Sequence, residues 1–162
     1  QAEVVVRAKV LSAGTAGLFE PGAPSSPYTP LNVQVLEVLS GDMELGAQTL
    51  YFPGGAVTAE EYLSKNPTSG QKIGLAELSQ SERKSKYLQF TSETDFDIKK
   101  NTEYVFVLGQ DVEKVAPDLF FVYVGAYGTF TKDKKNVKTQ KELKSTNAGK
   151  AKVQTEVNAA AN

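Results

Sequence analysis

Three carboxylates in the segment ETDFD are spaced for metal-binding chemistry. Glu93, Asp95 and Asp97 alternate along the chain, and alternate residues of an extended segment point to the same side. Carboxylate-rich sites of this kind suit Ca²⁺, a hard cation that prefers oxygen ligands. The EF-hand spacing, with its central glycine and distal glutamate, does not occur here. Two interpretations of Asp95 and Asp97 therefore stay open, a calcium site and a solvated acidic loop.

A second acidic segment holds Asp111, Glu113 and Asp118. A pair of carboxylates can act as general acid and general base, as in glycosidases, if their separation in space is right. Sequence positions do not fix that separation. A carboxylate-based or metal-assisted hydrolase that uses Asp95, Asp97, Asp111 or Glu113 is therefore the enzymatic alternative for this chain.

Other nucleophilic chemistry is narrowly limited, because the 162 residues include neither cysteine nor histidine. This composition excludes disulfides, thiolate nucleophiles, Cys-ligated zinc and a Ser-His-Asp triad. Ser79, Ser81 and Ser85 lie near Lys84 and Lys86. A Ser–Lys pair needs a desolvated lysine, whereas this segment is polar. We assign no catalytic residue, and calcium is the only cofactor that the sequence suggests.

Aromatic side chains are concentrated in the segments that read as strands. We expect about half of them to fill a core, as large apolar residues do in small barrels. The others are candidates for an exposed face that binds sugars, peptides or a partner strand. The candidate ligand-binding residues are Tyr51, Phe52, Tyr123 and Tyr127.

Charge is distributed unevenly along the chain. Residues 1–131 carry a net charge of −6, whereas residues 132–162 carry +5 and are rich in lysine. We interpret residues 140–162 as a polar tail whose lysines could lie on an anionic envelope polymer. Nucleic acid is not an expected partner, because the body is acidic and has no basic face with interleaved aromatics. No stretch approaches the roughly 18 apolar residues that span a bilayer.

Alternating apolar residues predict a β-rich domain over residues 1–139. In the first strand, Val4, Val6, Ala8 and Val10 alternate with Val5, Arg7, Lys9 and Leu11. Proline and glycine at 53–55 should end the third strand. The six predicted strands cover residues 3–11, 28–39, 48–52, 102–108, 119–124 and 137–139.

Residues 56–92 interrupt the strand pattern and read as an insertion laid over the barrel. Thr58 and Glu61 have capping-box spacing, which predicts a short helix over residues 59–64. Residues 76–86 are a second helical candidate. Short, mostly antiparallel strands with this insertion predict an all-β fold with minor α content: an OB-like, five- or six-stranded Greek-key barrel with a short helical insertion.

Several motifs resemble a known family. The runs VVVRAKVL, YTPLNVQVLEVLSGD and LYFPGG, with the later TEYVFVLG, resemble strands of the netrin-like domain found in tissue inhibitors of metalloproteinases. The same outline, with the late Gly128-Thr129-Phe130, resembles uncharacterised secreted proteins of Gram-positive bacteria. The resemblance covers roughly residues 3–55 and 95–131 and implies an OB-type fold. The inhibitors chelate zinc through an N-terminal cysteine that this chain lacks, so their activity is not carried over.

The resemblance and the residue types together favour a non-catalytic, extracytoplasmic binding or interaction domain, secreted or at the cell surface. The expected partner is a protein or an envelope polymer, and the sequence does not identify the ligand. The alternatives are the hydrolase described above and a structural module of the cell envelope. Exposed edge strands or large apolar patches would favour the structural module.

Overall fold

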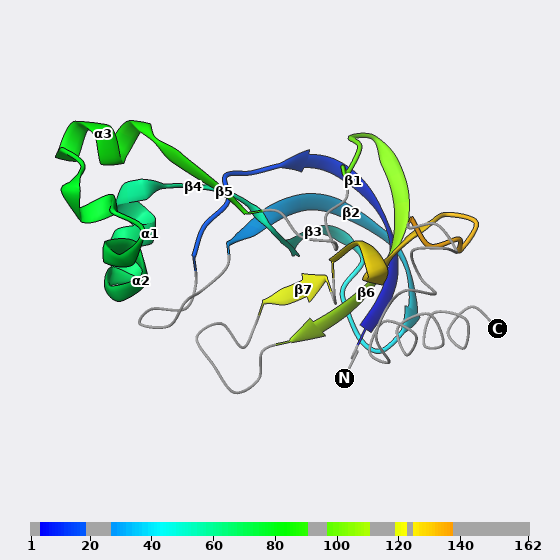
Figure 1. Cartoon of the computed structure of the whole chain (residues 1–162). Helices are drawn as coiled ribbons and strands as arrows, with labels where there is room; N and C mark the ends of the chain where they lie inside the picture. The colour runs from blue at the N-terminus through cyan, green and yellow to red at the C-terminus, as the bar shows by residue number, and fades with distance from the viewer. Residues whose placement is uncertain (1–3, 19–26, 91–96, 111–118, 123–124, 138–162) are drawn as a thin grey trace.

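The computed structural model describes residues 4–18, 27–90, 97–110, 119–122 and 125–137. These residues form one β-barrel and a helical projection (Figure 1). The main sheet consists of β1 (Val4–Ala13), β2 (Tyr28–Ser40), β3 (Gly46–Pro53), β6 (Thr102–Gln110), β7 (Phe120–Val122) and β8 (Thr129–Thr131). The other elements are β4 (Gly55–Thr58), α1 (Ala59–Lys65), α2 (Pro67–Lys72), η1 (Leu75–Glu77), α3 (Gln80–Ser85), β5 (Tyr87–Phe90) and η2 (Gly125–Gly128).

The main sheet closes into a ring. Its strands follow the order β1-β2-β3-β7-β6-β8, and β6 also pairs with β1. The pairing of β3 with β7 is parallel, whereas the other pairings in the ring are antiparallel. A five-stranded Greek-key ring of this order is the OB-type arrangement. The predicted all-β, OB-like barrel with minor α content is therefore confirmed.

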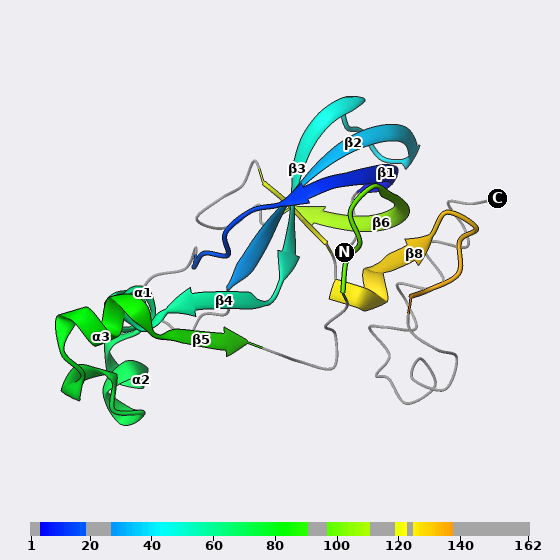
Figure 2. The same cartoon turned by 90° about the horizontal axis from the view of Figure 1, so that it is seen from above.

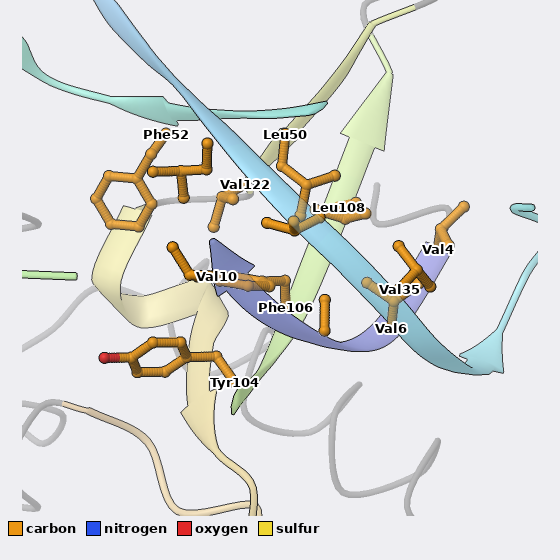
Figure 3. Close-up of a cluster of buried hydrophobic side chains, with 13 residues drawn as sticks. Val4, Val6, Val10, Val35, Leu50, Phe52, Tyr104, Phe106, Leu108 and Val122 are labelled. Carbon is orange, nitrogen blue, oxygen red and sulfur yellow. The ribbon is translucent and has the colours of Figure 1, made fainter. Parts of the chain in front are cut away.

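The barrel interior is a column of apolar side chains that alternate along each strand. Val4, Val6, Ala8 and Val10 of β1 point inward, as their period of two predicts. Figure 3 shows Val4, Val6 and Val35 at one end of this column, with Phe52 and Tyr104 at the other. The remaining buried members of the cluster are Leu31, Val33, Leu50, Phe106, Leu108 and Val122.

The last part of β2 departs from the simple alternation. Strict alternation predicts Glu37 on the inner side with Val35, and Val38 on the outer side. The register of β1 against β2 shifts between Val5 and Val6 and again between Arg7 and Ala8. Val38 consequently packs against the core, and Glu37 forms an ion pair with Arg7. Bulges of this kind insert an extra residue and reverse the sides that follow.

The sixth strand lies earlier in the chain than predicted. β8 covers Thr129–Thr131, whereas Val137 is a bend and residues 138–139 lie outside the described residues. Phe130 of β8 is paired with Val105 of β6, and both are fully buried. The run YVFVL in β6 is apolar on both faces, so its outer side needs a cover. β8 pairs with β6 on the edge opposite β1 and places Phe130 beside Val105.

The insertion between β3 and β6 projects away from the barrel instead of lying over it (Figures 1 and 2). β4 and β5 pair as an antiparallel arm, and the helices sit between them in sequence. The predicted helix at 59–64 is confirmed as α1, and Thr58 Oγ1 accepts a hydrogen bond from Glu61 N at 3.1 Å. No helix in the described ranges is long and apolar enough to cross a bilayer.

The insertion has an apolar cluster of its own, separate from the barrel core. Its buried members are Leu18, Val57, Ala59, Tyr62 and Leu75. Leu18 belongs to the chain that follows β1, so this cluster ties the insertion to the barrel. Glu61 Oε1 strengthens the tie, because it accepts a hydrogen bond from Leu18 N at 3.2 Å.

The turn between β3 and β4 depends on two glycines. Gly54 and Gly55 have φ angles of +106° and +126°, a region that disfavours residues with a Cβ. A Cβ on Gly55 would lie 2.6 Å from Ala16 Cβ and 2.6 Å from Thr29 Oγ1. Thr29 Oγ1 also donates to Gly54 O at 2.9 Å. The arm thus leaves the barrel at a point where the Gly55 backbone lies close to the side chains of Ala16 and Thr29.

Truncation of the central core residue Phe106 should strongly destabilise the barrel. Phe106 has no solvent exposure, and a Phe→Ala change in a core costs about 3–5 kcal/mol. We expect Phe106→Ala to lower the free energy of unfolding by that amount in urea denaturation. Leu45→Ala is the control, because Leu45 is 63% exposed and its truncation should change stability by less than about 0.5 kcal/mol. Equal losses in the two variants would contradict the assigned core.

The glycine at the root of the arm should be far less replaceable than another glycine with positive φ. Gly74 has a φ of +83°, but a Cβ added to it would have no atom within 4 Å, whereas Gly55 combines positive φ with two close contacts. Strain alone costs about 1–3 kcal/mol. We expect Gly55→Ala to lower the melting temperature clearly more than Gly74→Ala does, as measured by circular dichroism. A smaller effect of Gly55→Ala would show that the junction relaxes without cost.

Candidate functional site

Part of the outer side of β2 and β3 carries only uncharged side chains. Residues facing each other across the two strands include Pro30 and Tyr51, Asn32 and Thr49, and Gln34 and Ala47. Their neighbours Leu31 and Leu50 point into the core, so these residues point outward. We call this surface, together with one ring from β7, the neutral face. It comprises Tyr28, Pro30, Asn32, Gln34, Ala47, Thr49, Tyr51 and Phe121.

One end of the neutral face is an aromatic cluster. Phe121 of β7 is in register with Tyr51 of β3, and their ring centroids are 5.6 Å apart. Tyr28 of β2 meets the same Phe121 edge-on at 4.8 Å. All three residues are half-buried. The parallel closure of the barrel thus brings together three rings from three strands.

The other end of the neutral face is polar. Asn32, Gln34 and Thr49 are exposed and supply amide and hydroxyl groups that can both donate and accept hydrogen bonds. Asn32 Nδ2 donates to Ser12 Oγ at 2.9 Å, which holds the Asn32 amide in place. None of the eight residues of the neutral face is charged at neutral pH.

The structure separates the four candidate ligand-binding residues. Tyr51 lies on the neutral face, whereas Phe52 points inward and is only 6% exposed. Tyr123 lies outside the described residues, and so does the side chain of Tyr127, whose backbone is part of η2. Tyr28 was not among the candidates, although alternation from Leu31 places it on the outer side of β2 beside Tyr51.

A pocket of about 430 Å³ lies where the barrel meets the arm. We call it the barrel-mouth pocket. Phe52 contributes to its wall from the barrel, Phe90 from β5 and Asp97 from the segment before β6. Its volume lies within the roughly 300–1,000 Å³ of small-molecule sites. The inward direction of Phe52 therefore places it in a different candidate site from Tyr51.

Of the acidic residues named as metal or catalytic candidates, the structure describes only Asp97. Asp97 lines the barrel-mouth pocket, whereas Asp95, Asp111 and Glu113 lie outside the described residues. Within the described ranges, no three carboxylates gather in a way that could hold a metal ion. Asp97 is the only acidic residue among the described residues that line the pocket.

The clear pKa shifts belong to ion pairs and helix caps elsewhere on the surface. Hydrogen bonds from Arg7 to Glu37 and Glu103 raise the pKa of the Arg7 guanidinium, the bond to Glu37 being the larger cause. Hydrogen bonds from Ser79 lower the pKa of Glu82 at the start of α3, and Lys86 adds to the effect. Neither group belongs to the neutral face or lines the pocket, so both shifts have a structural cause.

The assignments of the fold and of the two candidate sites come from the sequence and the structure of this chain alone. No family model, no curated protein and no solved structure matches this chain.

Proposed function

We propose that this chain is a non-catalytic, extracytoplasmic binding module that holds an uncharged, carbohydrate-rich envelope polymer on the neutral face. The observation that carries the proposal is the aromatic cluster of Tyr28, Tyr51 and Phe121, which adjoins the exposed amide and hydroxyl groups of Asn32, Gln34 and Thr49, none of them charged.

Sugars present two kinds of surface that match the two ends of this face. Their C–H faces are apolar and pack against flat aromatic rings, which bury large areas with little loss of conformational freedom. Their hydroxyl groups need partners that both donate and accept, as Asn32, Gln34 and Thr49 do. A polymer lying along β2 and β3 would contact both ends of the face at once.

The charge of the face argues for a neutral polymer. Binding to nucleic acid or polyphosphate depends on lysine and arginine that neutralise phosphates, and none of the eight residues of the neutral face is basic. OB-type barrels frequently bind their ligands on the face of the second and third strands. That rule is an analogy at the level of fold, and it agrees with the position of the aromatic cluster.

The extracytoplasmic location rests on the sequence. The strand motifs resemble the netrin-like domain and uncharacterised secreted Gram-positive proteins. A chain without cysteine is compatible with the exported proteins of such bacteria. A protein partner on the same face is the competing outcome, and the experiment below separates it from a polymer.

Removal of one ring should clearly weaken polymer binding. We expect the full chain to sediment with at least one of three insoluble probes, namely chitin, cellulose and purified bacterial cell walls. Tyr51→Ala should weaken this binding by about tenfold or more, the loss expected of a central aromatic contact. Because the face is uncharged, binding should persist in 0.5 M NaCl, a salt concentration about three times the physiological value.

Tyr87→Ala is the matched control, because Tyr87 is 63% exposed and belongs to the arm. It should leave sedimentation unchanged, and urea denaturation should show that both variants are folded. Binding that is unaffected by Tyr51→Ala, or that is lost in salt, would overturn the proposal. Failure to sediment with all three polymers would also overturn it and would favour a protein partner.

A further inference from the structure

The barrel-mouth pocket is a second concave site, distinct from the neutral face. Its lining comes from the end of β1, the start of β2, the end of β3, the arm and the segment before β6. Segments from five places in the sequence thus converge beside Phe52, which Figure 3 places at one end of the barrel core.

Much of the pocket wall is apolar and firmly held. Leu31 and Phe52 belong to the barrel core, and Phe90 packs against the cluster of the insertion. Ile98 and Pro53 complete this apolar part of the lining. A ligand with a short hydrocarbon body would exchange water for these side chains, which favours binding by about 25 cal/mol for each Å² of apolar surface removed from water.

The polar part of the pocket offers hydrogen-bond acceptors, and one of them, the Asp97 carboxylate, is negatively charged. Thr29 Oγ1 already donates to Gly54 O. Asp97 forms no hydrogen bond or ion pair with any described residue, and neither does the Gln89 side chain. Asp97 is the only charged residue among the described lining residues.

The lysines nearest to Asp97 in sequence do not neutralise it. Lys99 and Lys100 are exposed, and neither lines the pocket. Among the described residues, neither forms an ion pair with Asp97. In the part of the chain that the structure describes, the pocket therefore combines an apolar wall with one exposed carboxylate, Asp97, that has no ion-pair partner.

From this combination we infer that the barrel-mouth pocket binds a primary ammonium group carried on a short aliphatic chain, as at the end of a lysine side chain. The hydrocarbon lies against Phe52, Phe90 and Ile98, and the ammonium group donates hydrogen bonds to Asp97 and Gln89. An ammonium group has three donors and no acceptor, which matches a site whose free polar groups include a carboxylate. This site is independent of the polymer proposed for the neutral face.

Three ligands of equal length test the inference: pentylammonium, 1-pentanol and pentanoate. Each is titrated into the full-length ¹⁵N-labelled protein, and backbone amide shifts are followed by NMR. Pentylammonium should bind at millimolar concentration, with saturable shifts at Gly54, Gln89 and Ile98 and none at Gln34 or Thr49. Pentanol should bind about tenfold more weakly, since it lacks the charged hydrogen bond, and pentanoate should not bind.

Asp97→Asn should weaken pentylammonium binding by about tenfold and leave pentanol binding unchanged. Asp42→Asn is the matched control, because Asp42 is exposed, is not among the lining residues and loses the same charge. It should bind pentylammonium like the unaltered chain. Equal binding of pentanol and pentylammonium, or equal losses in the two variants, would overturn the assignment. Absence of saturable shifts with all three ligands would also overturn it, without bearing on polymer sedimentation.

Discussion

The pairing of β1 with two strands at once is the constraint on which the barrel depends. β1 forms a ladder with β2 on one edge and, over seven residue pairs from Val4 with Leu108 to Val10 with Thr102, with β6 on the other. Strands adjacent in sequence could pair locally, but β1 and β6 are separated by about ninety residues, so their pairing must overcome a large loop-closure cost. The inward valines of β1 offset that cost by packing against Phe106 and Leu108.

The outer side of the same three strands is held by charge. Arg7 Nε lies 3.2 Å from Glu37 Oε2 on β2, and Arg7 Nη1 lies 2.5 Å from Glu103 Oε1 on β6. One guanidinium thus joins both neighbours of β1, and its planar fork suits two carboxylates. All three side chains are partly exposed, so each pair contributes about 1 kcal/mol or less. Both ion pairs lie beside the β1–β2 bulges, where Arg7 is in register with Glu37.

Closure of the barrel also creates the two candidate sites. The short parallel pairing of β3 with β7 places Phe121 beside Tyr51, which completes the aromatic end of the neutral face. The turn at Gly54 and Gly55 sends the chain out of the barrel close to Thr29, and the pocket forms at that exit. Both sites therefore depend on contacts between residues that are distant in sequence.

Local pattern in the sequence was sufficient to predict most of the strands and one helix. The alternation in β1, the density of β-branched and aromatic residues in β6, and the Pro53-Gly54-Gly55 stop each act over a few residues, and each is confirmed. The capping pair Thr58 and Glu61 acts over one turn in the same way. The absence of cysteine and histidine is likewise a property of the sequence alone, and it restricts the chemistry whatever the fold.

Tertiary structure decided the features that need distant partners. The bulges of β1 against β2 reversed the sides of Glu37 and Val38, because register depends on both strands. β8 formed on the edge of β6 opposite β1, and the arm that carries the insertion leaves the barrel at Gly55. The sequence also could not predict that Tyr51 lies beside Phe121, or that Phe52 and Asp97 line one pocket. The residues of each pair come together only after the chain has folded.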